Sequence, residues 1–267
     1  MNIFTKKLTR LSYYFICIIF IMNSDYLLNK NRLATASTVE EISSNKKSQR
    51  VTLDYVPPVD DAPQRGRKPL AGRGSNCPKS NKSLLALVPK WHLALTVNES
   101  PNLWFYVPYS PDVIKSAELT LWDEEQNKIS EIVYSIQNTP GIAQINVPEK
   151  LLEVDKRYKV GFSITCYKQD DGIETTNILP VVETWLKRVD LDNNLANQVK
   201  TATPREKYTL YAANGIWYEA LTELIELKES QNNDEQVTKD WQDLLNQSEV
   251  NLPELISEPI VSCCTAK

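Results

Sequence analysis

The stretch RYKVGFSITCY, Arg157–Tyr167, alternates apolar and polar residues along its whole length. Successive side chains of a β-strand point to opposite faces, so its apolar residues share one face. These residues are Tyr158, Val160, Phe162, Ile164 and Cys166. The stretch therefore predicts a strand that packs one face on a core and carries a cysteine at its end.

Similar short runs, separated by turn residues, surround this strand. They are LLALVP (84–89), HLALTV (92–97), LWFYVPY (103–109), SAELTLWD (116–123), EIVYSI (131–136), IAQINVP (142–148) and LPVVETWLKRVDL (179–191). About eight strands in roughly 110 residues are typical of a two-sheet sandwich of immunoglobulin size. We therefore predict an immunoglobulin-like antiparallel β-sandwich over residues 83–191, followed by a short helical region.

The helical region is predicted over residues 204–250. TPRE, Thr203–Glu206, is a capping box, and Asn214–Gly215 ends the first helix. Apolar residues at helical spacing predict a second helix from Trp217 to about Ser230 and a third around Trp241. The turn and second helix resemble a tetratricopeptide repeat, but a single unit favours a three-helix cap over a peptide-binding groove.

The first 82 residues are expected to lie outside the fold. A basic start precedes the apolar run Leu11–Met22, and small residues follow at Ala34 and Ala36, which predicts a signal peptide over 1–36. An uncleaved anchor, or cleavage at another position, stays open. Residues 37–82 are rich in Ser, Lys, Pro and Gly and predict a flexible basic linker.

Charge argues against a nucleic-acid binder. The formal net charge is −4, and it becomes −8 when residues 1–36 are removed. Residues 204–258 hold twelve acidic and four basic side chains. We interpret them as a solvated acidic face; attraction to the basic linker or to a basic partner is the alternative.

Four cysteines remain after the leader: Cys77, Cys166, Cys263 and Cys264. An even number in an exported chain predicts disulfides. Joining Cys263 to Cys264 closes a strained eight-membered ring, so we favour pairings that send one tail cysteine to Cys77 and the other to Cys166. The tail, 251–267, would then be tied to both the linker and the sandwich. Zinc is a rival, although the spacing of zinc knuckles is absent.

No catalytic constellation is visible. His92 is the single histidine, and only seven glycines occur, none in a phosphate-binding pattern. We expect no metal and no cofactor. Turn carboxylates such as Asp123 and Asp170 leave a hydrolase as the third hypothesis, behind a carbohydrate-binding module that uses strand aromatics such as Trp104.

Several pieces of the chain, taken in order, resemble a known family. These are RGR (65–67), LWFYVPY, AELTLWDEE, RYKVGFSITC, NGIWYEAL (214–221) and SEPIVSCC (257–264). They resemble the cyanobacterial domain-of-unknown-function family 928. The resemblance implies an exported protein of unassigned activity and brings no catalytic residues with it.

The expected function is therefore a non-catalytic, extracytoplasmic binding or assembly protein. Its partner would be an envelope protein or a cell-surface polysaccharide, and its mature form would not span the membrane. The expected interaction surface is on the helical cap at Trp217, Tyr218 and Glu219. Periplasm, outer membrane and secretion are all compatible with these features.

Overall fold

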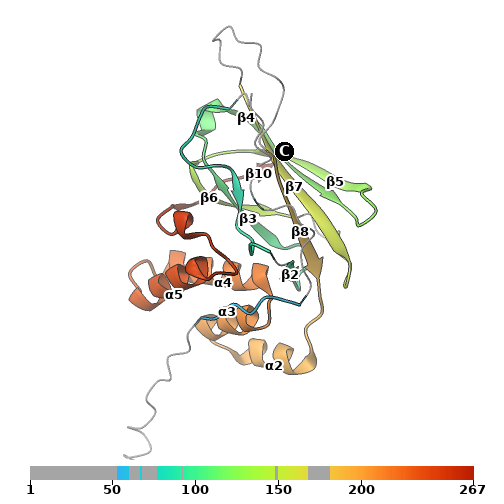
Figure 1. Cartoon of the computed structure of the whole chain (residues 1–267), viewed down its shortest axis with the longest axis vertical. Coiled ribbons are helices and arrows are strands. Elements are labelled where there is room, and N and C mark those ends of the chain that lie inside the picture. Colours follow the sequence, from blue (N-terminus) through green and yellow to red (C-terminus); the bar gives the residue numbers. More distant parts are fainter. Residues whose placement is uncertain (1–52, 60–66, 68–76, 92, 148–149, 168–180) are drawn as a thin grey trace, which may run out of the picture. The chain divides into compact units, whose positions relative to one another are not determined.

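The computed structural model describes residues 53–59, 67, 77–91, 93–147, 150–167 and 181–267. Within them, the strands form a four-stranded sheet in the order β1-β3-β6-β9 and a six-stranded sheet in the order β10-β5-β4-β7-β8-β2 (Figure 1). The strands are β1 Leu85–Ala86, β2 Ala94–Thr96, β3 Asn102–Val107, β4 Ile114–Trp122, β5 Lys128–Ser135, β6 Gly141–Asn146, β7 Arg157–Cys166, β8 Val181–Arg188, β9 Ile260–Val261 and β10 Thr265–Ala266. Short 3-10 helices occupy Pro111–Val113 and Pro253–Leu255.

The large sheet is built around β7, as the alternation of its sequence predicts. Phe162 lies opposite Leu119 of β4 and Val182 of β8, and all three side chains are fully buried. Phe162 also stacks on Phe105 of β3 with 4.4 Å between ring centroids. Since β3 belongs to the small sheet, this contact places the two sheets face to face, as in a sandwich.

The small sheet is covered on its other face by helices. Trp104 and Tyr106 lie on the face of β3 opposite to Phe105, yet both are buried. The indole Nε1 of Trp104 donates to Thr222 Oγ1 of α4 at 3.0 Å. The run LWFYVPY is therefore apolar throughout because both faces of this strand are covered.

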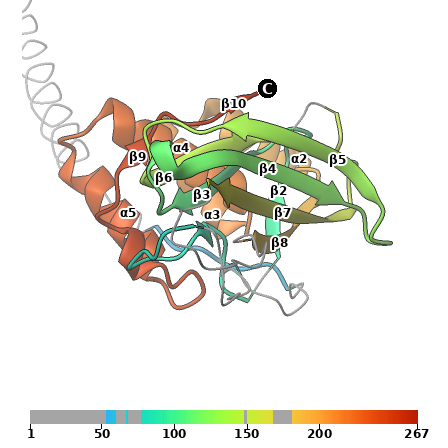
Figure 2. The ribbon, with the colours of Figure 1, turned by 90° about the horizontal axis from the view of Figure 1, so that it is seen from above.

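Strand pairing departs in two places from the predicted antiparallel sandwich. β2 runs parallel to β8, and β9 runs parallel to β6. β9 and β10 both lie in the tail, residues 251–267, where the sequence pattern predicts no strand. Ile260 lies opposite Ile142 in the small sheet, and Thr265 lies opposite Ser135 in the large sheet (Figure 2). The last residues of the chain thus join the edges of both sheets.

The described part contains four α-helices where three are predicted. They are α2 Asn193–Thr201, α3 Pro204–Ala213, α4 Trp217–Ser230 and α5 Glu235–Asn246. The additional helix, α2, is capped by Asp192, whose carboxylate accepts from the backbone N–H groups of Asn194 and Leu195. The capping box of Thr203 and Glu206 is present as predicted. No helix of the described ranges is long and apolar enough to cross a membrane.

Parts of the predicted linker are packed on the helices. Leu53 and Tyr55 are buried, and the ring of Tyr55 meets Trp217 edge-on at 5.0 Å. Val56 N donates to Ala212 O at 3.0 Å. The prediction of a flexible linker is therefore wrong for residues 53–59, where two aromatic or aliphatic side chains bury enough surface to order an extended segment. Residues 1–52, which include the predicted signal peptide, lie outside the described residues.

Candidate functional site

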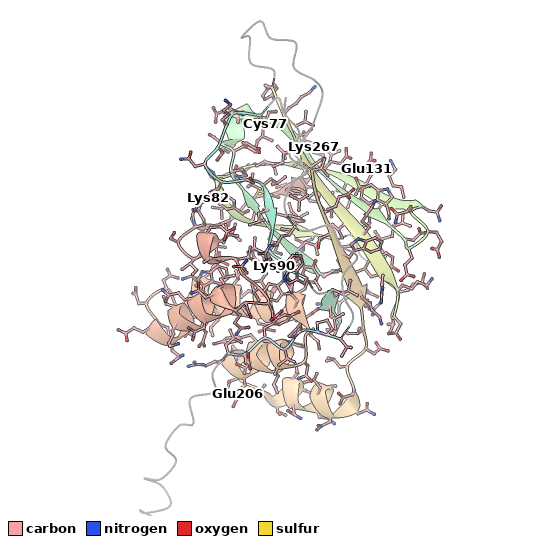
Figure 3. The ribbon with its side chains drawn as sticks, in the orientation of Figure 1. Cys77, Lys82, Lys90, Glu131, Glu206 and Lys267 are labelled. Carbon is pink, nitrogen blue, oxygen red and sulfur yellow. A yellow bond between two sulfur atoms is a disulfide. The ribbon has the colours of Figure 1, made fainter. Side chains whose placement is uncertain are left out.

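The cysteines pair differently from the prediction. Cys77 joins Cys166 with Cα atoms 5.1 Å apart, and Cys263 joins Cys264. Cys77 therefore ties the segment that precedes β1 to the end of β7. The two tail cysteines are paired with each other. Paired sulfurs are not thiolates, so these four residues do not form a zinc site. Figure 3 labels Cys77 near the end of the sheets where Lys267 closes the chain.

The residues predicted to form the interaction surface are buried. Trp217, Tyr218 and Glu219 begin α4 and expose 0%, 2% and 8% of their area. Trp217 Nε1 donates to Leu87 O at 2.7 Å, which anchors the helix to the first sheet segment. These three side chains hold the helical layer to the strands and cannot themselves contact a partner.

Glu219 links α4 to the end of β2. Its Oε1 accepts from Thr96 Oγ1 at 2.7 Å, Val97 N at 3.0 Å and Asn98 N at 3.2 Å. Its Oε2 is buried and has no partner in the described structure. Burial raises the pKa of this carboxyl above its usual range, against the opposing effect of the three hydrogen bonds.

A second buried carboxylate, Asp240, joins α5 to α3. It accepts from Arg205 Nη2 at 2.9 Å, from Gln236 Nε2 at 2.8 Å and from the hydroxyl of Tyr208. Burial, followed by the hydrogen bond to Asp240, raises the pKa of Tyr208 beyond the physiological range. Because all of these groups are satisfied by one another, the cluster is structural.

Arg67 fixes the segment that follows α5. Its guanidinium donates to the carbonyl oxygens of Val88, Val250 and Asn251. The residue is 6% exposed, and burial lowers its pKa. A buried guanidinium that donates to three carbonyls ties residue 67 to residues 250 and 251, more than 180 positions away.

A surface hollow of about 230 Å³ lies beside the tail disulfide. It is lined by Trp104 of β3, Gln144 and Asn146 of β6, Glu229 near the end of α4, and the tail from Ile260 to Cys264. The tail forms this wall because it crosses from β9 in the small sheet to β10 in the large sheet at residues 262–264. The hollow is thus made by three parts of the chain that are distant in sequence.

Amide side chains form a ladder along one side of the hollow. Gln144 Nε2 donates to Asn146 Oδ1 at 3.1 Å, and Asn146 Nδ2 donates to Asn102 Oδ1 at 3.0 Å. Gln144 Oε1 and the carboxylate of Glu229 have no hydrogen-bond partner among the described residues. The hollow therefore presents polar atoms that no other described group uses.

Other predicted candidates do not converge on a site. Asp123 accepts from the backbone and side chain of Asn127 within its own turn, and the side-chain hydrogen bond is the largest effect lowering its pKa. His92 and Asp170 lie outside the described residues. Trp104 is 3% exposed, so its ring offers no open platform for a sugar. No group of three His, Cys, Asp or Glu side chains that could hold a metal ion occurs in the described ranges.

The geometry defines a class: a two-sheet β-protein with a helical layer, two disulfides and a polar hollow at its tail. Residues 67–260 match the family described as Domain of Unknown Function (DUF928), and the chain belongs to this family. The match begins at the buried Arg67 and ends in β9, so the Cys263–Cys264 pair lies beyond it. No curated protein matches the chain.

Proposed function

We propose that this protein is a non-catalytic binding protein that acts outside the cytoplasm. The observation that carries the proposal is the hollow at the tail. Its wall is closed by a disulfide, and the carboxylate of Glu229 and the Oε1 atom of Gln144 face no partner of the described chain. Positioned polar atoms without a protein partner favour binding of a ligand or a partner surface.

The two disulfides support a location outside the cytoplasm. Disulfides persist in oxidising compartments, and one of them connects residues 89 positions apart. Together with the predicted signal peptide at 1–36, this favours export by a cyanobacterium to the periplasm, the outer membrane or the medium. The partner would be an envelope protein or a cell-surface polysaccharide.

An immunoglobulin-like sandwich and a tetratricopeptide-like helix pair are both compatible with a binding role. An immunoglobulin-like sandwich serves in many proteins as a rigid frame that presents a binding site at its edge. The α3–α4 pair, with its tetratricopeptide-like sequence, would act as a supporting layer. Its turn at Gly215 is already covered by residues of the chain itself, since a Cβ atom there would lie 3.0 Å from Val56 O.

Affinity capture tests the proposal. The full chain, oxidised and processed by its own cell, is exposed to detergent-solubilised envelope and to isolated wall polysaccharide. Glu229→Arg places a bulky cation in the hollow, and Glu226→Arg makes the same change at an exposed position one turn earlier on α4. We expect a specific partner that is retained by the wild type and by Glu226→Arg and is lost with Glu229→Arg. Equal retention by both variants would place binding away from the hollow.

A further inference from the structure

We infer that the hollow binds a single neutral sugar residue of a polysaccharide chain. This inference rests on the proposed binding function and names its ligand class. It comes from the combination of three properties at one place: the size of the hollow, its amide and carboxylate groups, and the charge of its lining.

Size limits the ligand to about one ring. Sites for drug-sized molecules enclose about 300–1,000 Å³, whereas this hollow has about 230 Å³. A dinucleotide or a folded peptide is too large, whereas one six-membered sugar ring with its hydroxyls is of the right order. The rest of a polysaccharide would extend into solvent at the open side.

The polar groups suit the edge of a sugar ring. A sugar hydroxyl both donates and accepts, so it pairs best with neighbouring acceptors and donors. Gln144 offers an unused acceptor at Oε1 and a second hydrogen on Nε2, because only one bond from Nε2 is taken by Asn146. Glu229 adds a carboxylate that can accept from two adjacent hydroxyls, and a charged acceptor strengthens these bonds.

The amide ladder holds Gln144 ready for this role. Asn146 donates to Asn102 and accepts from Gln144, so the three amides orient one another across β3 and β6. Asn102 lies opposite Asn146, and Trp104 lies opposite Gln144, in the same register. Side chains positioned by strands before the ligand arrives lose little conformational freedom on binding.

The tail gives the hollow a fixed side wall. Trp104 borders the hollow, but its ring is buried and its indole nitrogen is already used by Thr222, so it is not a stacking platform. The Cys263–Cys264 ring, together with Ile260 and Val261, forms the side. Because both ends of the tail are paired into sheets, this wall stands in a fixed position.

The charge of the lining disfavours an acidic ligand. Glu229 is the only side chain of the lining that carries a charge, and no Lys, Arg or His contributes to it. A sulfated sugar or a uronic acid would meet a carboxylate without a compensating cation, and like charges at such distances repel. The sugar would therefore carry hydroxyl or acetamido groups and no acid.

The experiment measures binding of defined oligosaccharides by titration calorimetry at low salt. The probes are cello-, malto- and chito-oligosaccharides, with oligogalacturonate as the acidic counterpart. We expect at least one neutral series to bind with one site per chain, and oligogalacturonate to bind at least tenfold more weakly. Gln144→Ala and Glu229→Gln should each weaken the neutral ligand about tenfold or more. Gln198→Ala on α2 and Glu226→Gln on α4, both exposed, should leave the dissociation constant unchanged.

A competing location keeps the inference open to refutation. Trp122 lies on the outer face of the large sheet, with its ring 4.4 Å from Lys159 Nζ, and could also face a sugar. If Trp122→Ala abolishes binding while Gln144→Ala does not, the hollow is the wrong site. Tighter binding of oligogalacturonate, or no binding of any neutral series, overturns the ligand class. Circular dichroism of each variant confirms that its fold is intact.

The outcome separates this inference from the proposed function. If a protein partner is captured from the envelope and is lost with Glu229→Arg, but no oligosaccharide binds, the proposed binding function holds and the sugar inference is wrong. If oligosaccharide binding survives every substitution at the hollow, the protein binds sugar but the hollow is not the binding site.

Discussion

Glu219 makes the stability of this protein fall as the pH rises through the acid range. Its carboxyl is almost fully buried, Oε2 has no partner, and burial raises its pKa above the usual value of about 4.3. Between the unfolded and the folded pKa, the native state retains a proton that the unfolded chain has released. The free energy of unfolding then decreases by up to about 1.4 kcal/mol per pH unit in that window.

The matched variant is Glu219→Gln, which keeps an oxygen for Thr96 Oγ1, Val97 N and Asn98 N and does not titrate. Burial and charge from Glu219 also raise the pKa of its neighbour Tyr218, so that phenol stays neutral throughout the experiment. The difference between variant and wild type therefore reports on Glu219 alone.

Urea unfolding of both proteins from pH 4 to pH 8 measures the effect. The contribution of Glu219 is fully present below the unfolded pKa and is lost as the pH rises through the folded pKa. We expect Glu219→Gln to gain stability relative to the wild type as the pH rises, until the folded carboxyl has ionised. A difference that stays constant over the whole range would refute the reasoning, because it would mean that the pKa is the same in both states.

Three further predictions concern stability and are checked by urea unfolding at pH 7. Cys77→Ala combined with Cys166→Ala opens a loop of 89 residues and should cost up to about 4–5 kcal/mol on the chain-entropy model; an unchanged midpoint would contradict it. Gly215→Ala should cost about 1–2 kcal/mol, because φ is +72° and the new Cβ would lie 3.0 Å from Val56 O; Gly161→Ala is not a suitable control, since Trp122 covers that position. Arg67→Met should cost about 3 kcal/mol or more by leaving the carbonyls it serves without their donor, whereas Lys200→Met on exposed α2 should change little.

The large sheet can be predicted from the sequence because one face of its strands is in contact with solvent. In β7 the alternation is complete, and Val160, Phe162 and Ile164 are fully buried as predicted. β3 is harder to predict, because a strand covered on both faces shows no alternation of apolar and polar residues. Its run of apolar residues predicted a strand, but only the position of α4 shows that Trp104 points to the helices and not to solvent.

Two errors share one physical cause: sequence periodicity describes an element but not what packs against it. The first turn of α4 carries Trp217, Tyr218 and Glu219 on several sides, and it is buried because residues 53–59 cover one side and β2 another. The segment 53–59 itself has no periodicity, so its burial depends on a surface that other residues provide. Helix α2 has a sequence signal in its Asp192 cap, although no helix is predicted there.

The hollow could be predicted only in part. Gln144 and Asn146 alternate with buried Ala143 and Ile145, so their shared face follows from the sequence of β6. The pairing of β9 with β6 brings the tail to them, and the packing of α4 on β3 brings Glu229; both contacts span more than 100 residues of chain. Pairing over such a separation leaves no local signature, and two strands of two residues each fall below what patterning detects.

The position of β9 and β10 has a consequence for how the molecule is made. The residues that complete the edges of both sheets follow their partner strands by more than 100 positions. Val250 and Asn251, which accept from Arg67, follow it by 183 and 184 positions. Domains generally begin to fold from the N-terminus during synthesis. Here β5 and β6 leave the ribosome long before β9 and β10, so each sheet keeps an unpaired edge during synthesis until residues 260–266 have been made.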